Sequence, residues 1–260
     1  MGILNVTPDS FSDGGAFLDC DKAVVHARQM VADGADIVDV GGESTRPGAD
    51  SVSTFQEIDR VVPVIERLAH DLSVLISVDT SKPAVMRAAV AAGAGLINDV
   101  RALREPGALE AAAETKRPIC LMHMRGDPRT MQRDPEYRDV VREVHDFLQA
   151  RMAAAMTAGI ARERIIIDPG FGFGKTPEHN LALLRHLRDL GGLAPIMVGL
   201  SRKSMIEKLL GLSMEQRTCA SVALAVVAAQ NGARIVRVHD VAGTVQALRM
   251  LEAIYPPAYG

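Results

Sequence analysis

The sequence has no tryptophan, only 3% aromatic residues and three cysteines among its 260 residues. Apolar residues still make up 48%, so the core must be built mainly from aliphatic side chains and alanine. The cysteines at positions 20, 120 and 219 show no Cys-x-x-Cys or Cys–His spacing. This pattern argues against a zinc site and against a disulfide framework, and it favours a reducing compartment.

Long hydrophobic runs and a strong charge of one sign are also lacking. No stretch of about 18 apolar residues occurs, and no basic segment precedes an apolar run at the N-terminus, so we predict neither a membrane span nor a signal peptide. The formal net charge is only −3, with both signs interspersed, which argues against binding to nucleic acid or to a membrane surface. We expect a soluble, cytoplasmic protein.

The chain does contain a regular alternation of short β-branched runs and alanine-rich amphipathic segments, many of which end in glycine, as at Gly34 and Gly159. Without a linker or composition break, this alternation predicts an α/β fold: one (β/α)8 TIM barrel domain over residues 1–260. The second choice is an open doubly wound sheet. The predicted strands are 2–6, 36–40, 75–79, 96–99, 118–123, 164–168, 195–199 and 234–238.

Polar residues occur where the predicted strands end. In a barrel these ends meet at one face, where the active site lies. Eight such coincidences in register are hard to explain by packing alone. The strand-end residues are Asn5, Asp39, Asp79, Asn98, His123, Asp168, then Ser201 with Arg202 and Lys203, and finally Arg237 with His239.

The segment IIIDPGFGFGKT (165–176) looks like a strand that feeds a phosphate-binding loop. A Walker A loop needs G-x-x-x-x-G-K-[ST], and here the first glycine would fall on Pro169. The dinucleotide pattern fails as well, so we expect the glycines to let the backbone approach a flat ligand. Asp168 then points into the barrel mouth, and Lys175 is left without a role.

Three strand-end groups could read one planar ring. Asp79 in SVDTSKP, Asn98 in LIND and Asp168 together offer donors and acceptors to an amidine-like edge, as in a pterin or guanine. Ser81 is expected to cap the helix that begins near Pro83.

A second group of residues is suited to an anion. Arg46, Lys203, Arg237 and His239 follow strands on the same predicted face, and Ser204 starts a helix in the usual phosphate region of this fold. The first loop, residues 7–18, is long for its position and is a candidate lid. His123 fits a catalytic role and a satisfied strand-end histidine equally well.

Together, the motifs GILNVTPDSFSDGG, DVGGESTRPGA, SVDTSKP, IND, LMHM, DPGFGFGK, SRKS and RVHD closely resemble the bacterial dihydropteroate synthase family. The resemblance runs in order along the whole chain. It implies a sulfonamide-target transferase that joins 6-hydroxymethyl-7,8-dihydropterin pyrophosphate to p-aminobenzoate. It also implies Mg2+ as cofactor and a homodimer. Family members usually carry a short segment ahead of the first strand, which we expect to be absent here.

The resemblance also implies residue roles. The pterin set is Asp79, Asn98, Met122, Asp168 and Lys203. The pyrophosphate set is Asn5, Thr45, Arg46, Arg237 and His239, in which Asn5 also meets Mg2+. The p-aminobenzoate set is Phe11, Pro47, Phe173 and Ser204. The catalytic set is Asp13, Asp79, Asp168 and Lys203, in which the carboxylates would stabilise a cation on the pterin methylene.

The sequence is also compatible with three other functions. A folate-binding methyltransferase barrel would share the pterin site but would need neither the STRPG nor the SRKS segment. A Schiff-base aldolase could use Lys203 or Lys175. A pterin-binding relative without catalysis is a further alternative, although all expected site residues are present.

Overall fold

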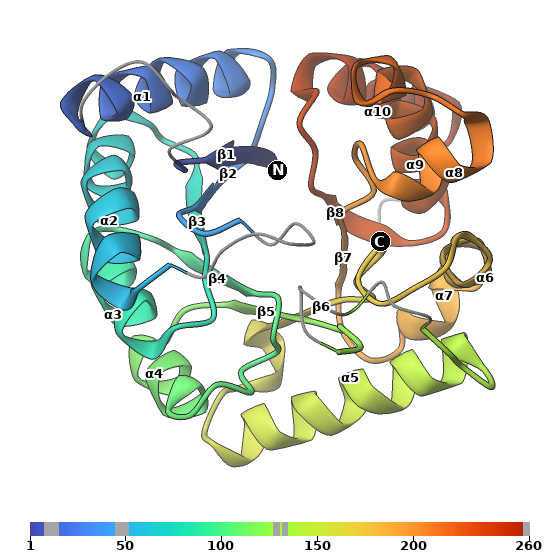
Figure 1. The fold of residues 1–260 in the computed structure, drawn as a ribbon, viewed down its shortest axis with the longest axis horizontal. Helices are drawn as coiled ribbons and strands as arrows, with labels where there is room; N and C mark the ends of the chain where they lie inside the picture. Colours follow the sequence, from blue (N-terminus) through green and yellow to red (C-terminus); the bar gives the residue numbers. More distant parts are fainter. Residues whose placement is uncertain (8–15, 45–51, 127–130, 132–134, 257–260) are drawn as a thin grey trace.

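Eight strands form an inner ring with the helices outside it in the computed structural model of the chain (Figure 1). The structure describes residues 1–7, 16–44, 52–126, 131 and 135–256. Within these ranges no helix is long and apolar enough to cross a membrane.

The strands pair in sequence order, and every neighbouring pair is parallel. Each predicted strand agrees with an observed strand to within two residues at either end. The strands are β1 (Gly2–Asn5), β2 (Ile37–Gly41), β3 (Leu75–Asp79), β4 (Leu96–Asp99), β5 (Ile119–Met122), β6 (Ile165–Asp168), β7 (Ile196–Val198) and β8 (Ala233–Val236).

The sheet closes between its last and first strands. Gly2 and Val238 form a parallel bridge, with Ile3 N donating to Val238 O at 3.0 Å and Val238 N donating to Met1 O at 2.9 Å. This closure removes the sheet edges. The (β/α)8 barrel prediction is therefore confirmed, and the open doubly wound sheet is excluded.

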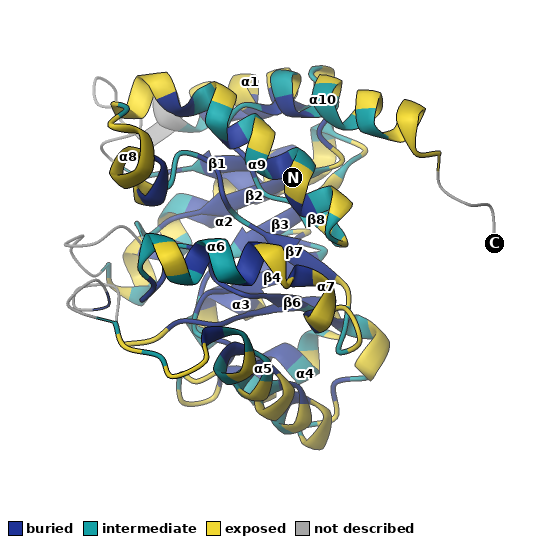
Figure 2. Ribbon diagram, turned by 90° about the vertical axis from the view of Figure 1, so that its right-hand side faces the viewer, coloured by how far each residue is buried: buried dark blue, intermediate teal, exposed yellow. Residues whose placement is uncertain are grey.

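The helices cover the outer face of the barrel, with their buried sides against the strands and exposed sides outward (Figure 2). Two of the helices lie between β6 and β7. The α-helices are α1 (Ala16–Ala32), α2 (Thr54–Asp71), α3 (Pro83–Ala91), α4 (Ala108–Thr115), α5 (Val140–Thr157), α6 (Pro177–Arg185), α7 (Leu187–Leu190), α8 (Ser204–Leu210), α9 (Thr218–Gln230) and α10 (Val241–Ile254). Short 3-10 turns η2 (Arg162–Arg164) and η3 (Met214–Arg217) precede β6 and α9.

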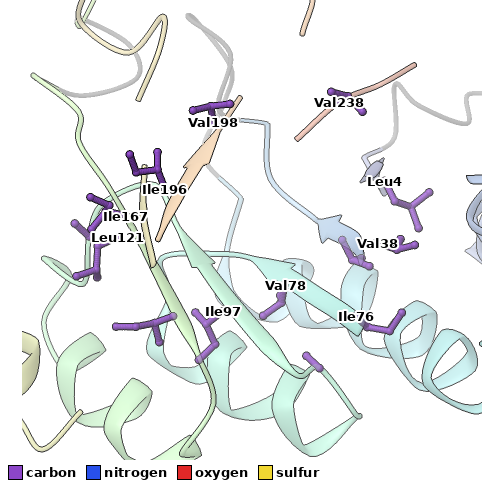
Figure 3. Packing of buried hydrophobic residues seen from close by; sticks show 14 of the residues in the cluster. Leu4, Val38, Ile76, Val78, Ile97, Leu121, Ile167, Ile196, Val198 and Val238 are labelled. Atoms are coloured by element: carbon purple, nitrogen blue, oxygen red, sulfur yellow. The ribbon is translucent and has the colours of Figure 1, made fainter. Parts of the chain in front are cut away.

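Strand periodicity separates the core from the site. In β3, Ile76 and Val78 belong to the hydrophobic cluster between strands and helices, as Figure 3 shows. Because side chains alternate along a strand, Ser77 and Asp79 point to the other face, into the barrel. The same alternation puts Ile167 in the cluster and turns Asp168 inward. An aliphatic outer layer thus carries polar groups toward the barrel mouth.

The helix ends discussed above lie where the sequence predicts them, except for one predicted cap. Gly34 and Gly159 adopt left-handed backbone angles with φ of 100° and 92°, as expected for glycines that end helices. Pro83 is the first residue of α3, but the predicted Ser81 cap is wrong. Ser81 Oγ donates to Asp99 Oδ1 instead. The Ser81 side chain is directed toward the buried carboxylate of Asp99 on the neighbouring strand, where it donates a charge-assisted hydrogen bond.

Candidate active site

A cavity opens at the carboxyl ends of the strands, on the face that the sequence predicted. Four of the five predicted pterin-binding residues come from the ends of β3, β4, β5 and β6, and the fifth follows β7. The cavity is lined by Asp79, Asn98, Val100, Met122, Asp168, Gly170, Phe171, Phe173, Gly199, Lys203 and Arg237.

Two largely desolvated carboxylates face this cavity, of which Asp168 is buried and Asp79 is slightly exposed. Burial raises the pKa of Asp79 to about 7, against the opposing attraction of Arg237. Burial also raises the pKa of Asp168 to about 6, although its Oδ1 accepts a hydrogen bond from Gly170 N at 2.7 Å. A group poised near neutrality in a cleft is typical of a functional site. Both carboxylates would be stabilised in their charged form by a cationic or donor-rich ligand.

Arg237 bridges two strand-end carboxylates. Its Nε donates to Asp39 Oδ2 at 2.6 Å and its Nη2 donates to Asp79 Oδ2 at 2.8 Å. Arg237 stays charged because two carboxylates face it, which raises its pKa despite burial. The contact with Arg237 alone would lower the pKa of Asp79, yet that pKa is raised. We conclude that desolvation outweighs the attraction of Arg237 at Asp79, since Asp39 shares the guanidinium.

Asp39 also orients Asn98. The amide Nδ2 of Asn98 donates to Asp39 Oδ2 at 3.1 Å, and Asp39 is fully buried. An amide whose nitrogen is engaged in this way presents its carbonyl oxygen as an acceptor. Asn98 itself lines the cavity, so Asp39 supports two cavity residues from below.

Lys203 is a cationic side chain that lines the same cavity. Its Nζ lies 4.2 Å from the centroid of the Phe173 ring, a distance at which an ammonium is attracted by the ring face. Burial, followed by repulsion from Arg237, lowers the pKa of Lys203 to about 8. The cavity therefore combines two carboxylates with two cations in a partly desolvated space.

The loops after β7 and β8 are tied to one another. Ser201 Oγ lies 3.0 Å from His239 Nδ1 and accepts from His239 N at 3.2 Å. Arg202 forms an ion pair with Asp240 at 2.7 Å. Burial, with the nearby Arg202, lowers the pKa of His239 to about 4, so its ring is neutral at pH 7. These ties hold Lys203 and Arg237 on the same side of the barrel mouth.

The glycines after β6 serve backbone packing. Gly170, Gly172 and Gly174 all have left-handed φ values, from 66° to 79°. A Cβ on Gly170 would lie 1.9 Å from the backbone oxygen of His123. The expected close approach is thus mainly to the segment after β5, while Gly170 alone of the three lines the cavity.

Lys175 is buried beneath this glycine loop. Its Nζ donates to Gly170 O at 2.9 Å and to Phe173 O at 3.1 Å, and it lies 2.8 Å from His123 Nδ1. Thr176 caps α6, because its side chain accepts from His179 N. The lysine and threonine that look like the end of a phosphate loop therefore fix the local backbone. His123 is a satisfied strand-end histidine.

The structure brings many, but not all, of the predicted site residues together. Those that line the cavity are Asp79, Asn98, Met122, Asp168, Phe173, Lys203 and Arg237. His239 contacts Ser201 instead of lining the cavity, and Ser204 is an exposed residue at the start of α8, directly after Lys203. Predictions that lie outside the described residues concern Phe11, Asp13, Thr45, Arg46 and Pro47.

Asn5 ends β1 beside the cavity. Its Oδ1 and Asp79 Oδ2 each lie 3.8 Å from the point that a Cβ on Gly41 would occupy. Two oxygens from different strands therefore gather near Gly41. Among the residues that the structure describes, no group of three His, Cys, Asp or Glu side chains could hold a metal ion alone.

Sequence reasoning missed several contributors. The sequence marks Asp39 only as a strand-end residue, although it anchors Asn98 and Arg237. Its position in a predicted strand, between apolar neighbours, was the available signal. The cavity-lining residues Val100, Phe171 and Gly199 carried no recognisable signal, because their role depends on loop conformation.

Comparison with known proteins agrees with this geometry. The family model of the pterin binding enzymes matches residues 1–239. The chain is 55% identical to the dihydropteroate synthase of Escherichia coli (strain K12) over 254 residues, or 97% of this chain and 90% of that protein. The Yersinia pestis dihydropteroate synthase with a sulfonamide drug is 54% identical, with a TM-score of 0.94 over 98% of this chain and 93% of that one. The Xanthomonas albilineans dihydropteroate synthase with 4-aminobenzoic acid is also 54% identical, with a TM-score of 0.94 over 99% of this chain and 93% of that one.

Proposed function

This chain belongs to the dihydropteroate synthase family of pterin binding enzymes, and from that membership we propose how its residues divide the reaction. The enzyme joins 6-hydroxymethyl-7,8-dihydropterin pyrophosphate to p-aminobenzoate, giving 7,8-dihydropteroate and pyrophosphate. One observation carries the proposal: Asp79, Asn98 and Asp168 meet Lys203 and Arg237 in a single cavity. The two carboxylates and the amide suit a planar, donor-rich ring, and the cations suit its polar and anionic parts.

The pterin ring is bound by Asp79, Asn98, Asp168 and Lys203, with Met122 against its face. The support is that all five side chains line the cavity. A carboxylate accepts two parallel hydrogen bonds from an N–C–N edge, while an ammonium donates to ring oxygen or nitrogen. The inward direction of Asp79 and Asp168 follows from strand alternation, so the ring is held by rigid elements.

The p-aminobenzoate ring is bound beside Phe173. The support is the cavity position of Phe173 and the start of α8 at Ser204, which can donate to a carboxylate. Phe11 and Pro47 are assigned to the same pocket from the family motifs. A sulfonamide would compete for this space because it also carries an aniline ring and an anionic group.

The pyrophosphate is bound by cations and polar groups around the mouth of the barrel. Arg237 lines the cavity, and His239 follows it by two residues on the loop after β8. Asn5, at the end of β1, and Thr45 and Arg46, which follow β2 in the sequence, complete this set. Neutral His239 can donate from one ring nitrogen to a phosphate oxygen.

The reaction begins when the C–O bond to pyrophosphate breaks and the leaving group takes the bonding electron pair. The pterin methylene then carries a resonance-stabilised positive charge. Asp79 and Asp168, with Asp13 from the first loop, stabilise this charge electrostatically in a partly desolvated site, where a fixed carboxylate acts strongly.

The aniline nitrogen next attacks the methylene with its lone pair and afterwards loses a proton to solvent or to pyrophosphate. A strong electrophile needs no powerful general base. Lys203 contributes by donating hydrogen bonds that hold the pterin, from the side of the cavity where its Nζ faces the Phe173 ring.

Mg2+ is assigned as the cofactor. Asn5 Oδ1 is an oxygen ligand of the kind that Mg2+ prefers, and Asp79 Oδ2 lies in the same region near Gly41. This donor set suits an ion that takes most of its ligands from the substrate phosphates and water. When bound, the ion supplies charge neutralisation on the leaving pyrophosphate.

The decisive experiment measures pyrophosphate release. We expect release only when pterin pyrophosphate, p-aminobenzoate and Mg2+ are all supplied, and we expect EDTA to stop it. A sulfonamide should inhibit competitively with p-aminobenzoate. A folded protein that releases no pyrophosphate with both substrates would contradict the assignment, whereas activity in EDTA would contradict only the Mg2+ requirement.

A homodimer in the cytoplasm is part of the same proposal. Exposed apolar side chains on the C-terminal helices support a subunit contact, including Val227 on α9 and Met250 on α10. Light scattering of the purified chain would test the dimer, and a mass of one chain at micromolar concentration would contradict it.

A further inference from the structure

We propose that Lys175 is a positioning residue that sets the place of Phe173 and thereby the binding of p-aminobenzoate. The inference rests on the proposed function, because it takes Phe173 as part of the aminobenzoate pocket. Lys175 does not line the cavity whose described wall includes Phe173 and Lys203.

The ammonium of Lys175 is fully engaged. Only 2% of the residue is exposed, and Nζ has three partners: the carbonyls of Gly170 and Phe173, and His123 Nδ1. An ammonium has three donors and no acceptor, so this set uses all of them. Burial lowers the pKa of Lys175 to about 7, against the attraction of Asp168. In its protonated form, an ammonium with these three partners has no donor left for a substrate. This geometry also argues against Lys175 as a Schiff-base nucleophile.

His123 completes the arrangement from the end of β5. Its Nδ1 faces the ammonium and must accept, so the neutral ring carries its proton on Nε2. Burial and the nearby Lys175 lower the pKa of His123 to about 2, which keeps it an acceptor. Its ring also packs edge-on against Phe147, with 4.8 Å between centroids.

The two carbonyls that Lys175 binds are the ends of one tight turn. Phe173 N donates to Gly170 O at 3.1 Å, and Nζ closes the same turn from below. The Gly170 end has further support, because Gly170 N donates to Asp168 at 2.7 Å. Loss of the ammonium should therefore displace Phe173 more than Asp168.

The position of Phe173 affects two lining groups of the proposed aminobenzoate pocket, which are its own ring and Lys203. Its ring lies in the cavity and faces the ammonium of Lys203 at 4.2 Å. Without Lys175, a buried carbonyl and an imidazole nitrogen lose a donor, and the turn gains freedom to relax. Binding of the substrate that contacts Phe173 would then have to order the turn again, which weakens the affinity for that substrate.

The test compares Lys175→Met with wild type in steady-state kinetics. We expect KM for p-aminobenzoate to rise roughly tenfold, as for loss of one hydrogen bond to a charged group. KM for pterin pyrophosphate should change less than about twofold on the same reasoning, because Asp168 keeps its own anchor. Arg151→Met is the matched control, since Arg151 donates to the carbonyls of Ala102 and Leu103 in another loop. The control should leave the ratio of the two KM values unchanged.

Hydrogen exchange gives a readout that needs no substrate. The Phe173 amide should exchange faster in Lys175→Met than in wild type, while the Gly170 amide changes less. If wild type makes no dihydropteroate, the proposed function fails, yet this exchange result still tests the positioning role. If Lys175→Met does not fold, His123→Leu removes one partner only and should raise KM for p-aminobenzoate by a smaller factor. Equal changes in both KM values, or no change in a folded variant, would overturn the inference.

Discussion

Arg237 Nη2 donates a hydrogen bond to Asp79 Oδ2 at 2.8 Å and so joins the loop after β8 to the end of β3. The Arg237 side chain is 19% exposed and that of Asp79 is 10% exposed, so neither charge is well solvated. Removal of Arg237 would leave buried carboxylates without their cation, whereas Arg237 would keep Asp39 if Asp79 were removed.

The first prediction concerns Arg237→Met and the stability of the fold. The substitution leaves Asp39 and Asp79 buried without their cation, and breaking a buried ion pair in this way typically costs about 3–5 kcal/mol. Urea unfolding at pH 7.5 should show a corresponding fall in the free energy of unfolding. Arg237→Lys is the control, because it keeps the charge but cannot bridge both carboxylates. Its free energy of unfolding should lie between those of wild type and Arg237→Met. An unchanged unfolding midpoint in Arg237→Met would contradict this account.

The second prediction concerns Asp79→Asn and the rate. The amide keeps the shape of the side chain but loses the charge that would bind the pterin and stabilise the methylene cation. Loss of about 3 kcal/mol of charged hydrogen bonding lowers kcat/KM roughly a hundredfold. Circular dichroism should show an intact fold. If a folded Asp79→Asn protein has the wild-type rate, Asp79 does not belong to the reaction.

The third prediction is a pH dependence of stability in the ligand-free enzyme. Folding raises the pKa of Asp79 from 3.8 to about 7 and that of Asp168 from 3.8 to about 6, chiefly through burial. The folded state then binds more protons than the unfolded state across this window. The contribution is present below about pH 4 and is lost as pH rises through 6 to 7.

Urea unfolding of wild type and Asp79→Asn from pH 4.5 to 8 tests this dependence. The variant has no titrating group at position 79, so its free energy of unfolding should rise relative to wild type as pH increases. A difference between the two proteins that does not vary with pH would show that burial does not raise the pKa of Asp79.

Much of the fold could be predicted because strand signals are local. Apolar runs such as IIID put Ile165 and Ile167 toward the helices and leave Asp168 at the strand end, whatever the neighbouring strands are. The barrel then brings strand ends together by topology alone. Asp79, Asn98 and Asp168 were therefore recognisable as one site before their contacts were known.

Contacts that depend on register or loop shape could not be predicted. Asp39 meets Asn98 and Arg237 only because β2, β4 and the end of β8 converge, and no spacing in the chain encodes that. Ser81 fits a helix cap locally, yet its hydroxyl donates a hydrogen bond to a tertiary acceptor, Asp99. Lys175 has backbone carbonyls for partners, which leave no mark in a sequence.

The fourth prediction concerns Gly170→Ala. The new Cβ would lie 1.9 Å from the backbone oxygen of His123, and φ at this position is 69°. A left-handed backbone costs a non-glycine residue about 1–2 kcal/mol, and the clash with fixed backbone adds to this. We expect a loss of about 3 kcal/mol or more in the free energy of unfolding.

Two alanine substitutions separate the causes of that loss. Gly159 has φ of 92° with nothing within 4 Å of a new Cβ, so Gly159→Ala reports the backbone penalty alone, about 1–2 kcal/mol. Gly192 has neither a left-handed φ nor a close neighbour, so Gly192→Ala should be nearly neutral. Equal losses in Gly170→Ala and Gly159→Ala would mean that the segment after β5 moves aside.

The last prediction concerns Asp39→Asn and the orientation of Asn98. Asp39 can only accept hydrogen bonds, so it fixes the Asn98 amide with its nitrogen inward and its oxygen available to the cavity. An asparagine at position 39 can accept or donate, so it no longer fixes the neighbouring amide. The affinity for a pterin ligand should fall about tenfold, as for one hydrogen bond to a charged group, although residue 39 does not line the cavity. Calorimetric titration with pterin pyrophosphate measures this.

Ser77→Ala is the matched control for Asp39→Asn. Ser77 is fully buried, pairs with Asp39 in register, and its Oγ has no hydrogen-bond partner among the described residues. Its loss should leave pterin affinity unchanged, because it orients nothing in the cavity. If Asp39→Asn binds pterin as tightly as Ser77→Ala does, Asn98 must be oriented by its other surroundings. If both variants bind weakly, the barrel interior is sensitive to any change, and the specific role of Asp39 is wrong.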